Sequence, residues 1–155
     1  MDDILEVLAP AHPALAELLT FWESKLPASG MPLRRDFDPQ EMRQHLPFLY
    51  IFEALPDCQD FRARLVGTSI ASTRGRDVTG QLLSDIMANV PRAFSVIRDA
   101  MRRAALSGRP VFLRGRTFWL EGKEFLPFES SYLPLTGNRA GEVLILGATY
   151  YDGLT

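Results

Sequence analysis

The first apolar stripe at helical spacing lies near the start of the chain. In residues 12–26 an apolar side chain recurs every three or four positions, and Pro13 suits a first helical turn. The stripe consists of Leu15, Leu18, Leu19, Trp22 and Leu26. The pattern predicts an amphipathic helix. A short second helix is predicted over residues 38–46, because Asp38, Pro39 and Glu41 form a capping pattern.

A longer amphipathic helix is predicted over residues 89–108. Pro91 stands near its start, arginines occupy its last turn, and Gly108 is a stop signal. Polar residues share one face: Arg92, Ser95, Asp99, Arg102 and Arg103. The opposite face is apolar and is formed by Phe94, Ile97, Met101 and Ala104 or Ala105.

Five further stretches have the residue types and alternation of strands. They are residues 48–55, 61–70, 110–120, 124–135 and 142–151. The first two flank "PDCQD", a polar connection of hairpin length, so we expect them to pair antiparallel. The last stretch is apolar at both parities, with Val143, Ile145 and Thr149 on one face and Leu144, Leu146 and Ala148 on the other. A central strand covered on both faces explains that pattern.

The order of these elements predicts an α+β domain. Helices precede two strands, a longer helix follows, and three strands complete the chain. Such an order indicates one five-stranded antiparallel sheet with helices on one face, flanked by the N-terminal helix.

Composition and charge narrow the class of protein. A chain of 155 residues with 46% hydrophobic and 23% charged residues is expected to fold as one domain. The net charge of -2, with dispersed arginines, does not favour nucleic acid or anionic lipid as a partner. Cys58 is the only cysteine, which excludes an internal disulfide and a thiolate metal cluster. The acidic start and the lack of a long apolar run predict neither a signal peptide nor a membrane span, so we expect a cytoplasmic protein.

Three short motifs, in consistent order and spacing, resemble the PAS domain. They are Leu65-Val66-Gly67-Thr68 at the end of a strand, "GRDVTG" at residues 75–80, and Leu133-Pro134-Leu135. The likeness covers about residues 22–151. More narrowly, the chain is similar to short single-domain bacterial PAS proteins that begin with a tryptophan-bearing helix and a "P…R…DP…LP" segment. Here that segment consists of Pro32, Arg35, Asp38, Pro39, Leu46 and Pro47.

The resemblance implies a five-stranded antiparallel sheet cupped by short helices, with a small cavity between them. Such domains commonly sense ligands or cofactors, or mediate association. We expect a helical flank over residues 1–46 and a PAS-like domain over residues 47–155. No output domain fits after the last strand, so the effector would be a separate chain.

The "GRDVTG" turn is interpreted as structural. A phosphate site would need closely spaced glycines at a helix N-terminus, and neither G-x-G-x-x-G nor G-x-x-x-x-G-K-[ST] occurs. Gly75 and Gly80 can instead supply positive φ at two bends, while Asp77 or Thr79 bonds free amides. Arg74 and Arg76 are expected in solvent, with anion binding at the cavity rim as the alternative.

Two cofactors known from PAS domains do not fit the residues present. Haem-binding PAS domains usually take an axial histidine from the long helix, and residues 90–108 contain none. Flavin photochemistry needs a cysteine just ahead of that helix, whereas Cys58 lies in the first hairpin connection. The sequence therefore argues against haem and cysteinyl-flavin, and Cys58 is interpreted as a small loop residue.

Enzymes with small cone-shaped α+β folds are the rival class, because these folds can pair a buried carboxylate with a hydrogen-bond donor. Glu129 and Tyr132 are the nearest such pair, but a separation of three points them to opposite faces of a strand. His45 is expected at a helix cap or on the surface. No catalytic constellation is predicted.

The cavity that the resemblance implies lies between the long helix and the inner face of the sheet. Residues expected to border it are Phe94, Ile97, Met101, Phe112, Ser130 and Tyr132, most of them as core. Two arginine pairs, Arg62 with Arg64 and Arg114 with Arg116, are expected in solvent. A guanidinium that turned inward would need a partner, and a small carboxylate would be a natural one.

The N-terminal helix is expected to cover the outer face of the sheet, either in cis or across a two-fold axis. A homodimer would then use Leu15, Leu18, Leu19 and Trp22. The sequence therefore predicts a non-enzymatic sensory module that binds a small anionic or apolar ligand or a protein partner. The alternatives are a small-molecule enzyme and a ligand-free dimerisation scaffold with a packed interior.

Overall fold

The computed structural model describes residues 4–117 and 126–151. The strands are β1 (Ile4–Val7), β2 (Leu49–Ala54), β3 (Phe61–Val66), β4 (Val111–Arg116), β5 (Pro127–Thr136) and β6 (Val143–Tyr151). The α-helices are α1 (Pro13–Ser24), α2 (Thr68–Arg74), α3 (Leu83–Ile86) and α4 (Pro91–Ser107), and short 3-10 helices span Arg34–Asp36, Leu46–Phe48 and Pro56–Cys58. This order confirms the predicted α+β class.

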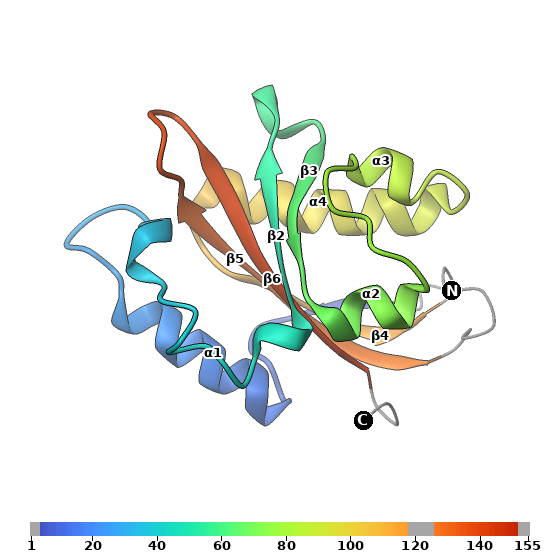
Figure 1. Cartoon of the computed structure of the whole chain (residues 1–155), viewed down its shortest axis with the longest axis horizontal. Helices are drawn as coiled ribbons and strands as arrows, with labels where there is room; N and C mark the ends of the chain where they lie inside the picture. Colours follow the sequence, from blue (N-terminus) through green and yellow to red (C-terminus); the bar gives the residue numbers. More distant parts are fainter. Residues whose placement is uncertain (1–3, 118–125, 152–155) are drawn as a thin grey trace.

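The strands form one antiparallel sheet in the order β1-β4-β5-β6-β2-β3. Figure 1 shows α1 on one side of the strands and α2, α3 and α4 on the other. Two apolar clusters result. The inner core lies on the α4 side and includes Tyr50, Ile97, Met101, Tyr132 and Ile145. The outer core lies on the α1 side and includes Leu15, Leu18, Trp22, Leu133 and Leu146. The apolar pattern at both parities of β6 therefore predicted its central place correctly.

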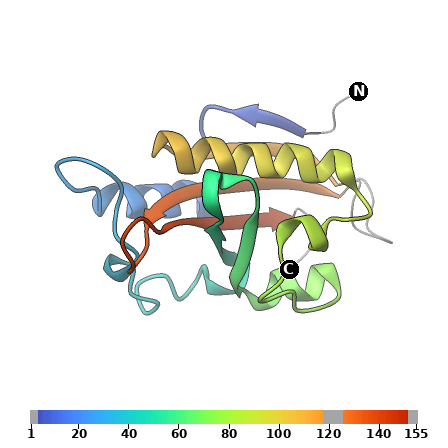
Figure 2. The same ribbon diagram turned by 90° about the horizontal axis from the view of Figure 1, so that it is seen from above.

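The sheet has one strand more than the five that the sequence pattern predicted. The additional strand is β1, which pairs with β4 from Ile4 opposite Gly115 to Val7 opposite Phe112. A strand of four residues is too short to stand out in the sequence. Figure 2 shows β1, in blue, at one margin of the molecule.

Two predicted boundaries differ from the structure near the start of the domain. The strand expected over residues 61–70 ends at Val66, and α2 begins directly after Gly67. At Gly67 a Cβ would lie 2.4 Å from the carbonyl oxygen of Leu46, so only glycine fits this crossing. The helix expected over residues 38–46 is a series of hydrogen-bonded turns, such as His45 N–H to the Met42 carbonyl.

The "GRDVTG" turn has the predicted structural role. Gly75 and Gly80 adopt φ of 95° and 89°. The Asp77 carboxylate accepts hydrogen bonds from the amide and hydroxyl of Thr79, which lowers the pKa of Asp77. Arg76 is exposed as expected, but Arg74 is half-buried.

Helix α1 covers the outer face of its own sheet. Leu15, Leu18 and Trp22 are buried, and the Trp22 indole N–H donates to the Pro134 carbonyl at 3.0 Å. Leu19 is half-buried, and Leu26 lies beyond the helix end and is exposed. The helix therefore packs in cis, and a dimer cannot use the three buried side chains while α1 stays in this place.

Candidate ligand-binding site

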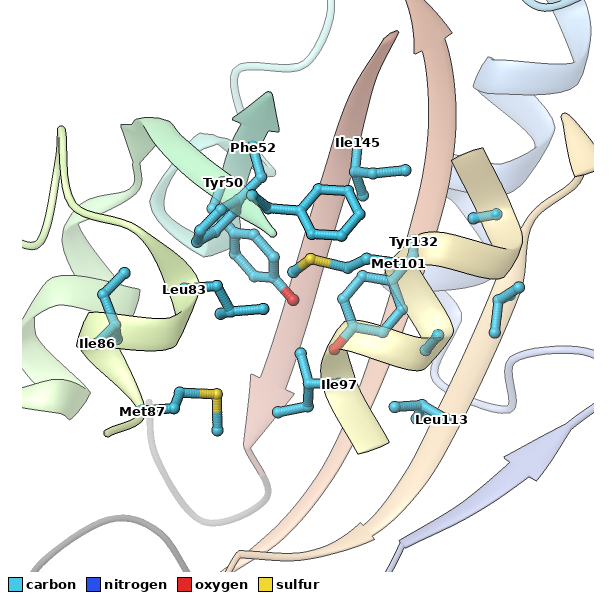
Figure 3. Packing of buried hydrophobic residues seen from close by; sticks show 14 of the residues in the cluster. Tyr50, Phe52, Leu83, Ile86, Met87, Ile97, Met101, Leu113, Tyr132 and Ile145 are labelled. Carbon is cyan, nitrogen blue, oxygen red and sulfur yellow. The ribbon is translucent and has the colours of Figure 1, made fainter. Parts of the chain in front are cut away.

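A cavity of about 70 Å³ lies between the inner face of the sheet and helices α2, α3 and α4. Figure 3 shows Leu83 and Met87 on one side of this region, Ile97 and Met101 on the other, and the hydroxyls of Tyr50 and Tyr132 directed between them. Most of the lining is apolar. The lining residues with polar side chains are Tyr50, Ser130, Tyr132, Thr149, Tyr151 and Arg74.

Four of the six residues proposed from sequence line this cavity. They are Ile97, Met101, Ser130 and Tyr132. Phe94 is half-buried beside the inner core, and the Arg98 guanidinium lies 5.6 Å from the centroid of its ring.

Phe112 lies on the opposite face, in the outer core. Val111, Phe112 and Leu113 are all buried, so the parity of β4 could not be read from its apolar residues. The prediction that Phe112 borders the cavity was wrong for this reason.

A hydroxyl network forms part of the cavity lining. Thr149 Oγ1 lies 2.9 Å from Tyr50 Oη and 2.8 Å from Ser130 Oγ. The Tyr50 ring packs directly on Gly147, where a Cβ would lie 2.0 Å from a ring carbon. Sequence reasoning did not single out Tyr50, Gly147 or the cavity role of Thr149. A glycine inside a strand pattern was the available signal, because it often marks a close approach.

Arg74 is the inward guanidinium, and it comes from α2 rather than from a strand. Burial lowers its pKa, and among the described residues no carboxylate forms an ion pair with it. A solvent position was expected because turn arginines are commonly solvated, and a place at the cavity rim was the alternative. The helix that begins at Thr68 instead turns Arg74 toward the sheet.

The four strand arginines point to solvent as predicted. Arg62 donates to the Gly80 carbonyl, and Arg64 forms ion pairs with Glu53 and Glu142. Arg114 and Arg116 are exposed on β4. Arg74 therefore differs from these arginines in lining the cavity.

The candidate carboxylate and hydrogen-bond donor of the rival enzyme class are separated by the sheet. The Glu129 carboxylate accepts hydrogen bonds from the amides of Ala11 and His12 on the α1 side, at 3.0 and 3.2 Å. Tyr132 points to the inner cavity. The two side chains lie on opposite faces, as their spacing predicted. In the described part of the chain, no three His, Cys, Asp or Glu side chains gather where they could hold a metal ion.

His45 is the N-cap residue of the 3-10 helix Leu46–Phe48, one of its two expected places, but its side chain makes no capping hydrogen bond and is buried rather than on the surface. Its ring lies 3.2 Å from Glu17 Oε1 and 3.2 Å from Tyr150 Oη, because the turns of residues 39–45 pass close to α1. Burial and the negative charge of Glu17 raise the pKa of Tyr150 to about 12. The phenol is therefore held neutral and is not poised for proton transfer at neutral pH.

Cys58 lies in the β2–β3 connection as predicted. Its side chain is buried, and burial raises the pKa of the thiol. A thiol with a raised pKa is a poor nucleophile.

The four tyrosines predict how the fold responds to alkali. Burial raises the pKa of Tyr50, Tyr132, Tyr150 and Tyr151 above 10.0 in the folded protein. The unfolded chain loses phenolic protons near pH 10 while the folded one keeps them, so stability is unaffected below pH 10 and falls as pH rises above it. We expect tyrosinate absorbance to appear together with unfolding, and Tyr150→Phe to reduce the loss of stability. Four phenols that titrate near pH 10 in a protein with native circular dichroism would contradict this.

A comparison with known families identifies the fold. The family model described as PAS domain matches residues 10–150. The chain belongs to the PAS domain family. No curated protein matches the sequence. PAS domains are in general sensory or signalling modules without enzymatic activity, and they commonly mediate protein association. Within the described ranges, this PAS domain has no helix long and apolar enough to cross a membrane.

Proposed function

We propose that this PAS domain is a non-enzymatic cytoplasmic sensor. It binds a small molecule in the cavity between α4 and the sheet and passes the state of the cavity to a separate effector protein. The observation that carries the proposal is the composition of the cavity, in which apolar side chains surround inward hydroxyls and the Arg74 guanidinium. Small-molecule sites have this combination of apolar lining and few convergent polar groups.

Two features favour ligand binding over the alternative functions. A ligand-free scaffold is expected to have a packed interior, whereas a cavity of about 70 Å³ lies between the sheet and the helices. An enzyme of the rival class needs a carboxylate or histidine that faces its substrate. The described lining of the cavity includes neither.

Methionine methyl groups report directly on this cavity. The chain has five methionines, of which Met87 and Met101 line the cavity and Met42 lies in the outer core. In protein labelled at the methionine methyls, a cavity ligand should shift the NMR signals of Met87 and Met101 and leave Met42 in place. We expect this result from at least one compound of a small-metabolite library.

A matched pair of variants decides whether such shifts come from the cavity. Ile70 of α2 lines the cavity and is half-exposed, so Ile70→Trp should block it, whereas Ser72 of the same helix faces solvent. Ligand shifts should vanish in Ile70→Trp and persist in Ser72→Trp. The proposal is wrong if no compound shifts Met87 and Met101, or if the shifts survive Ile70→Trp.

We also propose that the sensor is a homodimer. Its contacts would lie outside the buried α1 stripe, and the β1 edge, where Leu5 and Leu8 are exposed, is a suitable surface. Sedimentation velocity at tens of micromolar protein tests this, and a sharply monomeric profile would count against it. For the effector, proximity labelling in the native host should capture different proteins with wild type and Ile70→Trp. An identical set would show that the cavity does not control association.

A further inference from the structure

We propose that the ligand is a short-chain monocarboxylate, with its carboxylate on Arg74 and its carbon chain inside the cavity. The inference rests on the proposed function, because it specifies what the cavity binds.

Arg74 carries a positive charge that the described groups around it do not balance. Arg74 is half-buried. The described groups that interact electrostatically with its guanidinium are the phenols of Tyr151 and Tyr50 and the guanidinium of Arg76. Burial keeps both phenols neutral at physiological pH, so neither balances the cation. Among the described residues no carboxylate pairs with this partly desolvated cation, and an anionic ligand would compensate its charge. A planar carboxylate matches the fork of N–H donors on a guanidinium.

Arg74 lies at the mouth of the cavity. The half-exposed lining residues are Val66, Ile70, Arg74 and Tyr151, and the other lining residues are buried. The mouth of the cavity therefore lies beside α2 and the end of β6. A ligand held by Arg74 keeps its charged end at this mouth and extends its other end toward Ile97, Met101 and Met87, which are apolar. The proposed ligand thus has one charged end and an apolar body.

The cavity also limits the size of its ligand and the number of negative charges that the ligand can carry. One water needs about 10–15 Å³ of such space, so the 70 Å³ cavity accepts about five waters, or a molecule of about six non-hydrogen atoms such as butyrate. Arg74 is the one cationic side chain among the described lining residues. A second negative charge, as in a dicarboxylate or a phosphate dianion, would be buried without a partner. The cavity therefore favours a single carboxylate.

The test compares two molecules that differ in charge and hardly in shape, sodium butyrate and butyramide. Each is titrated into the full chain while the methyl signals of Met87 and Met101 are followed. In wild type, butyrate should bind at least about tenfold more tightly than butyramide, since a charged hydrogen-bonded contact is lost in the amide. Arg74→Gln should remove this difference by weakening butyrate alone.

The neighbouring Arg76 supplies the control. It is exposed and does not line the cavity, so Arg76→Gln should leave the preference for butyrate unchanged. Arg74→Lys keeps the charge without the guanidinium fork and should give an intermediate preference. It also serves if Arg74→Gln fails to fold.

The other outcomes reject either the carboxylate contact alone or the proposed sensor function as well. Equal binding of butyrate and butyramide, or loss of the preference in Arg76→Gln as large as in Arg74→Gln, rejects the carboxylate contact and leaves the sensor function standing. Binding of library compounds but not of butyrate, or tighter binding of inorganic phosphate than of butyrate, does the same. If no compound at all reaches Met87 and Met101, the proposed function itself fails.

Discussion

Replacing Gly147 with alanine should destabilise the protein by about 3 kcal/mol, at the upper end of what overpacking of a core usually costs. The new Cβ would lie 2.0 Å from one Tyr50 ring carbon and 2.6 Å from two others. The ring cannot simply move aside, because it is buried and its hydroxyl bonds Thr149. The φ of Gly147 lies outside the region that favours glycine, so the backbone itself would accept alanine. Urea unfolding of the two proteins measures the difference.

A double-mutant cycle isolates the steric cause of this loss. In a Tyr50→Leu background the ring is gone, and Thr149 keeps its bond to Ser130. Gly147→Ala should then cost less than about 0.5 kcal/mol, so the two substitutions should be strongly non-additive. Additive effects would show that Gly147 is needed for a reason other than the ring of Tyr50.

Trp22→Ala should cost about 4 kcal/mol, the usual range for removing a large aromatic side chain from a core. Trp22 is 3% exposed and joins α1 to β5 through its indole N–H. Its loss leaves a large void in the outer core and removes the donor to the Pro134 carbonyl. Thermal and urea unfolding both measure the effect.

Two control variants show how much of this loss comes from the buried volume of Trp22 and how much from its indole N–H donor or from its place in the stripe. Trp22→Phe keeps much of the apolar volume and loses the donor, so it should cost less than Trp22→Ala. Leu26→Ala belongs to the same sequence stripe but changes a residue that is 44% exposed, and it should cost about 0.5 kcal/mol or less. A loss of stability in Leu26→Ala as large as that in Trp22→Ala would contradict the packing of α1 on its own sheet.

The sequence predicted those elements whose pattern is long and unambiguous. Helix α4 has an apolar face flanked by proline and glycine signals, and β6 is apolar at both parities. These local patterns were sufficient to place the long helix and the centre of the sheet. The turn at Gly75 and Gly80 was predictable because few residues other than glycine accept its backbone conformation.

Elements that depend on partners far away in the sequence were not predictable. Strand β1 exists because β4 offers it an edge, and the α2 helix begins where Gly67 crosses the backbone of Leu46. Thr68 and Ile70 are β-branched residues common in strands, so propensity alone extended the preceding strand.

The last three residues of β6 connect the two sides of the domain. Thr149 and Tyr151 line the cavity, whereas the ring of Tyr150 between them stacks at 4.4 Å on His12, at the start of α1, and on Phe48. One backbone segment carries all three side chains, and the sheet is only one layer thick. We expect a molecule that displaces Tyr151 from within the cavity to shift Tyr150 against His12, the N-cap residue of α1. The N-terminal helix is thus in a position to respond, on the opposite face of the sheet, to a ligand in the cavity.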